Sequence, residues 1–357
     1  MRVCIHNIGK PDTRRGTSTH DTSREVPMQV IHEVGIDVGA QTLVVHSQQG
    51  RQRQPLACFD NQASGHTQLI RWATKGGRSV RVCLEATGVY SLALTLALHR
   101  HPRIEVMVVN PRASRHFSQA LMKRAKTDPV DAEVLLAFLQ RMPFVPWQPP
   151  SQEVLQLQAI TRRISQLKKA LSQESNRRHA NGYRSAIANV ITPDLEVSID
   201  QLKERIEQLE LQGRQLVASV PELEAKFQRL ISTTGIGQTS ALAILAEILV
   251  WPEDLQPEQW VAQAGLDPRP RDSGTSLHKP RFISKAGNKY LRAALYMPAI
   301  VALRYQPQVK AFYEKLVAAG KKKMQAIVAV MRKLLRCFWA MLKHDQDFEG
   351  EKFYLLA

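Results

Sequence analysis

The pattern of apolar and polar positions changes near residue 30. Residues 1–27 are polar and irregular, with five basic and three acidic side chains. They predict a flexible basic arm over residues 1–29, or an extension upstream of a start near Met28. Beyond it, short apolar runs alternate with helical periodicity. The predicted strands are 33–39, 42–46, 55–59, 80–84 and 104–109, and the predicted helices between them are 63–74 and 90–99.

This order of elements predicts a mixed sheet. The first three strands are spaced as an antiparallel meander, and a helix, a strand, a helix and a strand follow. With one more helix after the last strand, the order is that of a ribonuclease-H-like α/β fold, a mixed sheet flanked by helices. In that fold the first and fourth strands lie side by side at the centre of the sheet. We expect this domain to cover residues 30–145.

The second half of the chain is patterned as helices. Pro143–Pro150 holds four prolines in eight residues and predicts a stiff linker. Two long helices follow with apolar residues at coiled-coil spacing, which we interpret as a contact with a second copy of the chain, or alternatively as an antiparallel hairpin within one chain. Residues 146–228 form the linker and these helices, and residues 229–357 form a further, mostly helical domain. The seam positions are Leu157, Ile160, Ile164, Leu167 and Leu171, then Ile199, Leu202, Ile206, Leu209 and Leu216.

Composition indicates a partner that is a polyanion. Among 357 residues, Lys and Arg exceed Asp and Glu by 17, a balance that points to nucleic acid. Between Gly265 and Lys343 there are 17 basic residues against 3 acidic ones, so most of the excess lies there. No run of 18 apolar residues is present, so we expect no membrane span, and the first residues lack the apolar core of a signal peptide. We therefore expect a cytoplasmic protein, whose four scattered cysteines match no zinc spacing and stay reduced.

Four carboxylates are the first candidate chemistry. Asp37 and Glu85 each end a predicted strand, on the two strands expected to be neighbours. Asp128 is the expected N-cap of a helix that begins with Pro129, and Asp131 follows one turn later. If this helix packs at the same edge of the sheet, four carboxylates share one cleft and require cations. Their oxygens suit Mg²⁺ or Mn²⁺, and two such ions about 4 Å apart would clamp the attacking and leaving oxygens of a phosphodiester.

Each acid also has a purely structural explanation. Asp37 fits a turn after a strand, Glu85 fits a helix entry, and the other two fit a capped helix start, worth about 1 kcal/mol. The same fold also serves actin-like ATPases and sugar kinases, in which a Gly-Ile-Asp-x-Gly strand opens a phosphate loop. Those proteins carry further glycine-rich phosphate loops, which this sequence lacks. We therefore interpret the four acids as one site.

Several basic or glycine-rich features predict contact with nucleic acid. The first long helix has a basic outer face. Gly235-Ile236-Gly237 feeds a helix over 241–249, as in helix-hairpin-helix motifs whose free N–H groups hold a phosphate; a plain helix–helix turn is the alternative. Ser273-Gly274 is either a loop turn or a hydroxyl nucleophile among cations that stabilise phosphoryl charge. The residues predicted to contact nucleic acid are Arg162, Arg163, Lys168, Lys169, Gly235, Gly237, Arg269, Arg271, Lys279, Arg281, Lys285, Lys289 and Arg292.

The motifs together resemble a known family. Gly35-Ile36-Asp37-Val38, Leu84-Glu85-Ala86-Thr87-Gly88 and Lys126-Thr127-Asp128-Pro129-Val130-Asp131-Ala132 look like the DEDD tetrad of bacterial insertion-sequence transposases. The family is the IS one-ten family, with its IS eleven-eleven subgroup and the related Piv invertases, and Asn110-Pro111 also fits its pattern. The likeness implies a first domain similar to the RuvC Holliday-junction nuclease and a C-terminal transposase domain, joined by coiled-coil helices.

The resemblance implies a recombinase with two chemical centres. The tetrad Asp37, Glu85, Asp128 and Asp131 would hold Mg²⁺ or Mn²⁺. Ser273 would be the nucleophile of a covalent serine–DNA intermediate, with Ser276 and Ser284 as the fallback candidates. Such a protein excises and inserts its own mobile element at the bacterial nucleoid, guided by an element-encoded bridge RNA. Its dimer or tetramer would combine domains of different subunits into one composite site.

Two other functions remain compatible with the residues alone. A junction-resolving nuclease needs the four acids but not Ser273. A non-catalytic nucleic-acid scaffold needs the basic surface but neither the acids nor the serine. Alanine at Asp37 separates the scaffold from both enzymes, and alanine at Ser273 separates the recombinase from the nuclease.

Overall fold

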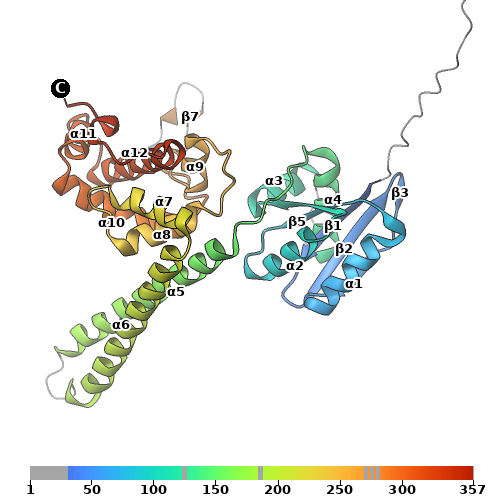
Figure 1. The fold of residues 1–357 in the computed structure, drawn as a ribbon, viewed down its shortest axis with the longest axis horizontal. Coiled ribbons are helices and arrows are strands. Elements are labelled where there is room, and N and C mark those ends of the chain that lie inside the picture. The colour runs from blue at the N-terminus through green and yellow to red at the C-terminus, as the bar shows by residue number, and fades with distance from the viewer. Residues whose placement is uncertain are drawn as a thin grey trace, which may run out of the picture. The chain divides into compact units, whose positions relative to one another are not determined.

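The computed structural model describes residues 31–122, 127–183, 188–268, 272–273, 277–278 and 282–356. The chain forms two compact units, residues 1–147 and residues 148–357 (Figure 1). Unit 1 contains a mixed sheet with helices, and unit 2 is almost entirely helical. The expected α/β first part and helical second part are therefore confirmed.

The sheet of unit 1 has the strand order β3-β2-β1-β5-β6, with β4 also paired to β2. Strand β1 is antiparallel to β2 and parallel to β5, and β5 is parallel to β6. The predicted neighbours, the first strand and the one after the first helix, are confirmed as β1 and β5. The short strand β3 was not predicted. The strands are β1 His32–Val38, β2 Thr42–Gln49, β3 Gln52–Arg53, β4 Ala57–Asp60, β5 Val80–Glu85 and β6 Ile104–Val109.

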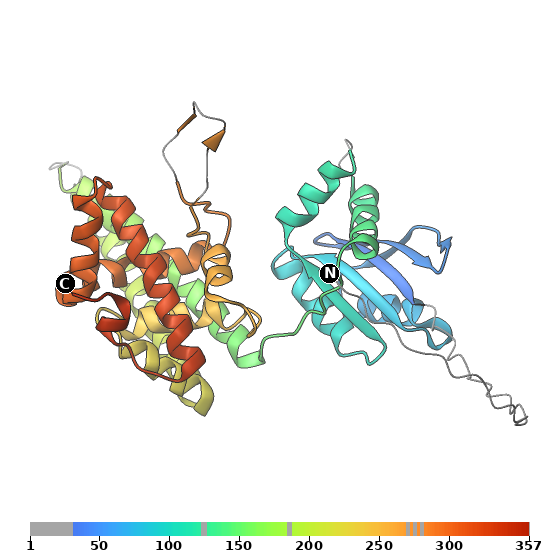
Figure 2. The same ribbon diagram turned by 90° about the horizontal axis from the view of Figure 1, so that it is seen from above.

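Helices cover both faces of this sheet, so its central strands are buried on both sides. One face packs with α1 (Ala63–Ala73) and α2 (Val89–His99) in the larger core of the unit. The other face packs with α4 (Asp128–Arg141), through Cys83, Leu135 and Leu139, and α3 (Pro111–Ala120) lies against α4 (Figure 2). After α4, the proline-rich segment has no helix or strand, and the Trp147 N–H donates to the Val106 carbonyl of β6 at 2.7 Å.

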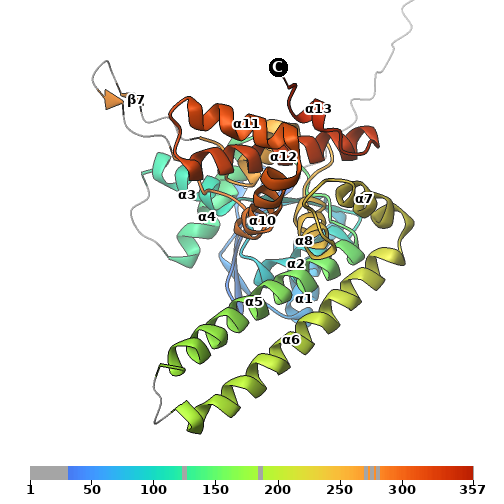
Figure 3. The same ribbon diagram turned by 90° about the vertical axis from the view of Figure 1, so that its left-hand side faces the viewer.

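A long helical hairpin opens unit 2. Helix α5 (Gln152–Asn181) and helix α6 (Ala188–Ala218) run side by side (Figure 3). Ile164, Leu167 and Ile206 are buried in their shared seam, with Ile160, Leu171, Leu202 and Leu209 packed around them. The predicted seam residues Leu157 and Leu216 belong instead to the larger core of unit 2. The apolar stripes therefore face each other within one chain, which is the antiparallel hairpin given as the alternative, and contact of these helices with a second copy stays a prediction. Periodicity alone does not distinguish the two arrangements, because both bury the same stripe.

The remaining helices of unit 2 surround one core. Helix α8 is apolar on nearly all sides and lies at its centre. Helices α11 and α12 are separated at Gly320, which has φ +80 and follows the end of α11. No helix in the described residues is long and apolar enough to cross a membrane. The helices are α7 Pro221–Ile231, α8 Gln238–Ile248, α9 Pro257–Gln263, α10 Lys289–Tyr305, α11 Pro307–Ala318, α12 Lys323–His344 and α13 Gly350–Phe353, with strands β7 Asp272–Ser273 and β8 Leu277–His278.

Candidate active site

Asp37 lies at the end of β1, on the face of the sheet covered by α4. Gly35 shares that face, because side chains alternate along a strand. A Cβ built on Gly35 would lie 2.3 Å from the Leu136 nitrogen and 2.5 Å from the Ala132 carbonyl oxygen. The α4 backbone thus rests directly on β1, which is possible only because residue 35 has no side chain. This close approach sets the first turn of α4 beside the end of β1.

Glu85 ends the neighbouring strand at the same level. The parallel register pairs Ile36 with Leu84, so Asp37 and Glu85 follow one step later on adjacent strands. A second contact holds Glu85, because the buried Ser114 hydroxyl donates to its Oε2 atom. Ser114 belongs to α3, whose N-cap Asn110 accepts a hydrogen bond from the Arg112 N–H at 2.9 Å. Asn110 was part of a predicted motif, whereas Ser114 was not predicted, because nothing near it in sequence links it to Glu85.

Asp128 and Asp131 both lie in the first turn of α4. The helix begins one residue earlier than predicted: Thr127 is the N-cap, Asp128 is the first helical residue and Pro129 the second. The predicted N-cap role of Asp128 was therefore wrong, by one position. Proline lacks a backbone N–H, but N–H groups in the first turn of a helix have no partner within the helix, so Pro129 removes no helical hydrogen bond there. The two carboxylates stay at the positive end of the helix dipole, as expected.

The other three acids of the cluster raise the pKa of Asp37. It is raised from 3.8 to about 6, first by desolvation and then by the negative charges of Asp128, Asp131 and Glu85. Like charges in one place disfavour the ionised form of each acid. The negative charges of the other three predicted acids therefore act together on Asp37.

The donor set of this cluster suits a hard divalent cation, because it offers carboxylate oxygens whose mutual repulsion a cation would relieve. The Thr87 hydroxyl, two residues after Glu85, is buried without a hydrogen-bond partner among the described residues. As the side chains stand, no three His, Cys, Asp or Glu residues of the described part of the chain are close enough to hold a metal ion. The four acids therefore suit a divalent cation in their chemistry and charge, but their carboxylates must move closer together to bind one.

Ser273 lies in unit 2, on the first strand of a small hairpin. Strand β7 pairs antiparallel with β8, and Ser273 stands opposite Leu277. Ser276, Arg269, Arg271, Lys279 and Arg281 lie outside the described residues.

The base of this hairpin is closed by paired backbone and side chains. Pro268 forms an antiparallel bridge with Ile283. The Ser284 N–H donates to the Asp267 carbonyl at 2.8 Å, and the Ser284 hydroxyl donates to the Asp267 carboxylate at 2.5 Å. Lys285 has φ +52, an unusual backbone conformation for a residue with a side chain. Ser284, a fallback nucleophile, thus already has a carboxylate partner that ties the hairpin base together.

Several predicted phosphate-binding residues have partners within unit 2. Arg162 donates two hydrogen bonds to the buried Glu247, at 2.7 and 2.9 Å. Asn288 also donates to Glu247, at 2.5 Å, so this acid links α5, α8 and the start of α10. Arg292 donates to the Ala264 carbonyl at 2.8 Å. These contacts give Arg162 and Arg292 structural roles. Glu247 was missed, although a single acid within an apolar helix is the kind of signal that indicates a buried pair.

Of the other residues predicted to contact nucleic acid, some have contacts within unit 2 and others are exposed. Lys168 pairs with Glu210 at 2.8 Å. Gly235 has φ +96, and a Cβ there would lie 2.9 Å from the Ala302 nitrogen, so this glycine permits close packing on α10. Gly237 is the N-cap of α8, with no atom within 4 Å of a Cβ built on it. Arg163, Lys169, Lys285 and Lys289 are exposed.

Known proteins are similar to this chain in both its first and its second half. A family profile described as "Transposase" matches residues 34–181, and one described as "Transposase IS116/IS110/IS902 family" matches residues 227–314. The pilin gene-inverting protein of Moraxella bovis is 31% identical over 297 residues, which is 82% of this chain and 89% of that protein. The putative transposase y4rJ of Sinorhizobium fredii is 29% identical over 64% of this chain and 69% of its own length. The insertion element IS110 43.6 kDa protein of Streptomyces coelicolor is 26% identical over 45% of this chain and 39% of its own length.

These matches define the class as a DNA transposase or recombinase, an enzyme that acts on DNA strands. Within that class, the chain belongs to the IS110 family of transposases. The predicted family is therefore confirmed.

Proposed function

We propose that this transposase excises and inserts its own mobile element through two chemical centres, a metal-dependent DEDD site and a serine nucleophile. Unit 1 would have a ribonuclease-H-like fold, which its mixed sheet and helix order support. The observation that carries the proposal is geometric: Asp37 and Glu85 end adjacent strands, and Asp128 and Asp131 lie in the first turn of the helix that packs on β1. A carboxylate whose pKa is raised by burial and by neighbouring acids, as that of Asp37 is, is typical of sites for cation-dependent phosphoryl transfer.

In the first centre, Asp37, Glu85, Asp128 and Asp131 would hold Mg²⁺ or Mn²⁺, which supplies stabilisation of charge on the scissile phosphate when bound. Ser114 keeps the Glu85 carboxylate oriented, and Gly35 lets the first turn of α4 stay close to Asp37. Desolvation and the neighbouring negative charges disfavour the charged form of Asp37, so its ionisation controls whether the cluster accepts a cation.

In the second centre, the Ser273 Oγ atom would attack a phosphorus of the DNA backbone. A bond forms between Oγ and phosphorus while the bond from phosphorus to a deoxyribose oxygen breaks. The serine hydroxyl gives up its proton, and the departing sugar oxygen gains one. Because one phosphodiester replaces another, the reverse attack by a sugar hydroxyl can rejoin the strand. Ser273 is carried on β7, and the Asp267–Ser284 pair fixes the base of that hairpin.

The finer parts of the proposal concern partners. The element's ends and its target are DNA, as the family implies, and the contact surface would include Arg163, Lys169 and the exposed cations near the serine hairpin. A guide RNA encoded by the element would direct the enzyme, and the working form would be a dimer or tetramer. Both parts of the proposal depend on the family resemblance. The α5–α6 seam is filled within one chain, so an oligomer would have to use other surfaces.

A covalent-adduct assay tests the proposal. Purified protein, Mg²⁺, labelled DNA of the element's end and the flanking transcript are combined and separated under denaturing conditions. We expect a protein–DNA adduct that is lost in Ser273→Ala and kept in the matched controls Ser276→Ala and Ser284→Ala. Asp37→Ala should abolish strand exchange but leave DNA binding largely intact. Cleavage without an adduct would favour a purely metal-dependent nuclease, and equal loss of binding and exchange in Asp37→Ala would count against a metal role.

A further inference from the structure

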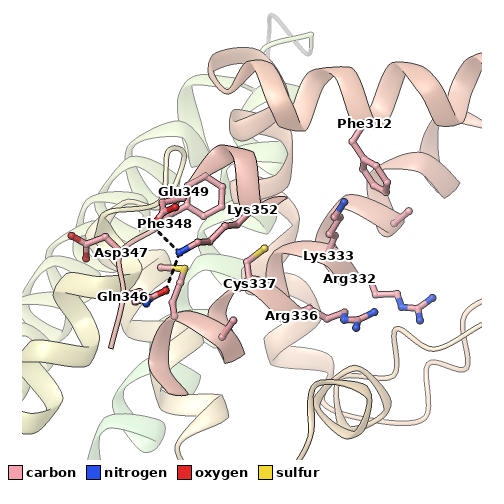
Figure 4. A pocket seen from close by; sticks show the side chains of 13 residues that line it. Phe312, Arg332, Lys333, Arg336, Cys337, Gln346, Asp347, Phe348, Glu349 and Lys352 are labelled. Carbon is pink, nitrogen blue, oxygen red and sulfur yellow. Dashed lines mark hydrogen bonds and ion pairs between the residues drawn. The ribbon is translucent and has the colours of Figure 1, made fainter. Parts of the chain in front are cut away.

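A cavity of about 590 Å³ lies within unit 2, among α11, α12 and the C-terminal segment (Figure 4). Phe312, Ala340, Met341 and Phe348 supply apolar walls. Its size falls in the range of pockets that bind small organic groups. None of the residues that line it belongs to the carboxylate cluster or to the serine hairpin.

Cations dominate the polar side of this cavity. Arg332, Lys333 and Arg336 all come from α12. Figure 4 shows the Arg332 and Arg336 side chains extending toward the same side, as residues four apart on a helix do. Arg336 pairs with Glu258 at 2.9 Å, but both side chains are largely exposed, and such a pair exchanges its partner at little cost. Among the described residues, Arg332 has no hydrogen-bond or ion-pair partner.

Lys333 is held by aromatic rings rather than by an acid. Its Nζ atom lies 4.4 Å from the ring centre of Phe312, 4.9 Å from that of Phe353 and 5.2 Å from that of Tyr354. Ring faces attract the charge but accept its N–H groups poorly, so the ammonium keeps unused donors. Burial and the neighbouring charges of Arg336 and Lys315 lower the pKa of Lys333. An anion in the cavity would relieve that repulsion.

The acids that line the cavity do not neutralise these cations. Asp347 accepts a hydrogen bond from Arg229 at 3.0 Å, and Glu349 accepts one from Lys352 at 2.8 Å. Both carboxylates are therefore matched by cations outside the α12 group. The cavity is left with an excess of positive charge next to apolar walls, a combination that suits a phosphate linked to a flat organic ring.

We propose that this cavity binds one unstacked nucleotide of a single strand, with its phosphate against Arg332 and Arg336 and its base against the apolar walls. The inference rests on the proposed function, in which single strands are exposed during strand exchange. Stacking on apolar and aromatic side chains holds any base, and the cations hold the backbone, so binding depends weakly on sequence. DNA and RNA share this chemistry, and the test distinguishes them.

Cys337 lines the cavity and reports on its occupancy. The experiment measures the rate at which iodoacetamide alkylates Cys337 in the full chain carrying Ser273→Ala, so that no strand cleavage intervenes. The exposed Cys58 of unit 1 serves as the reference thiol, and mass spectrometry separates the two. With a short single-stranded oligonucleotide at about ten times its Kd, we expect Cys337 to react about tenfold more slowly while Cys58 is unchanged. Protection by DNA, by RNA or by both identifies the source.

The variant Arg332→Gln should weaken oligonucleotide binding and lower the salt dependence of log Kd by about one unit. Lys343→Gln, on the same helix but not lining the cavity, is the matched control and should not change Cys337 protection. The proposal is overturned if no oligonucleotide protects Cys337, if only a free nucleoside monophosphate or an oligoglutamate does, or if Arg332→Gln leaves protection unchanged. Because the adduct assay does not depend on this readout, the two-centre proposal can survive such a result.

Discussion

Replacing Gly35 by alanine tests whether the contact between β1 and α4 builds the carboxylate cluster. The new Cβ would lie 2.3 Å from the Leu136 nitrogen and 2.5 Å from the Ala132 carbonyl oxygen, where ordinary contact begins at 3.4 Å. Both atoms are backbone, so no side-chain rotation relieves the clash. Helix α4 must therefore retreat by about 1 Å, at a cost of about 1–3 kcal/mol typical of an overpacked core.

The retreat should also change the chemistry. Asp128 and Asp131 move away with α4, so their charges act less on Asp37, and its pKa falls from about 6 toward 3.8. A misplacement of about 1 Å at a reacting centre costs roughly 100-fold in rate. We expect Gly35→Ala to lower strand exchange by about that factor while DNA binding persists. Urea denaturation measures the stability, and carboxyl-carbon NMR titration measures the Asp37 pKa.

Gly65→Ala is the matched control. A Cβ on Gly65 would lie 2.0 Å from the Asp60 carbonyl oxygen, so it also disturbs unit 1, but through α1 on the opposite face of the sheet. It should reduce stability and leave the Asp37 pKa near 6. If Gly35→Ala retains both exchange activity and the raised pKa, or if Gly65→Ala lowers the pKa equally, the argument that Gly35 positions the cluster is refuted.

Three further predictions concern charge and packing. The folded state binds the Asp37 proton more tightly than the unfolded state, so the thermal stability of metal-free protein should fall as pH rises from about 4 to about 6. The variant Asp37→Asn should show a smaller fall. Added Mg²⁺ should restore the thermal stability at pH 7 in the parent chain but not in Asp37→Asn. Arg162→Ala should cost about 3 kcal/mol in urea denaturation, because it leaves the buried Glu247 without a cation, and Glu247→Gln should cost less; equal costs would contradict the pairing. Ile206→Ala should cost about 2–4 kcal/mol, because it opens a cavity in the α5–α6 seam. Light scattering should give the parent oligomeric state for this variant, and dissociation would point to a seam shared between chains.

The sequence alone was sufficient to predict those elements whose residue pattern is compatible with a single structure. The strands at 80–84 and 104–109 and the helix at 63–74 match β5, β6 and α1 to within a residue or so. The adjacency of β1 and β5 followed from the order of elements, and the convergence on Asp37 followed from that adjacency. These predictions depended on periodicity and connection order, which local residues encode.

The missed features depend on contacts between distant segments. The Ser114–Glu85 hydrogen bond spans 29 residues, and the Arg162–Glu247 pair spans 85. Gly35 was noted as part of a motif, but the reason for a glycine there is the backbone of a helix about a hundred residues later. The stripes of α5 and α6 left contact with a second copy and a hairpin within one chain both open, because a stripe of apolar residues carries no information about which chain covers it.

The backbone contact between Trp147 and Val106 has a consequence for aggregation. Strand β6 ends the sheet order, so its outer edge presents backbone groups that could pair with a strand of another molecule. The Trp147 N–H occupies the Val106 carbonyl on that edge, and the proline-rich segment around it has few N–H groups to offer in exchange. The segment therefore shields the sheet as well as joining two units. A fragment of unit 1 cut before Pro143 would expose this edge and should self-associate, whereas one that keeps residues to 147 should remain monodisperse at the same concentration.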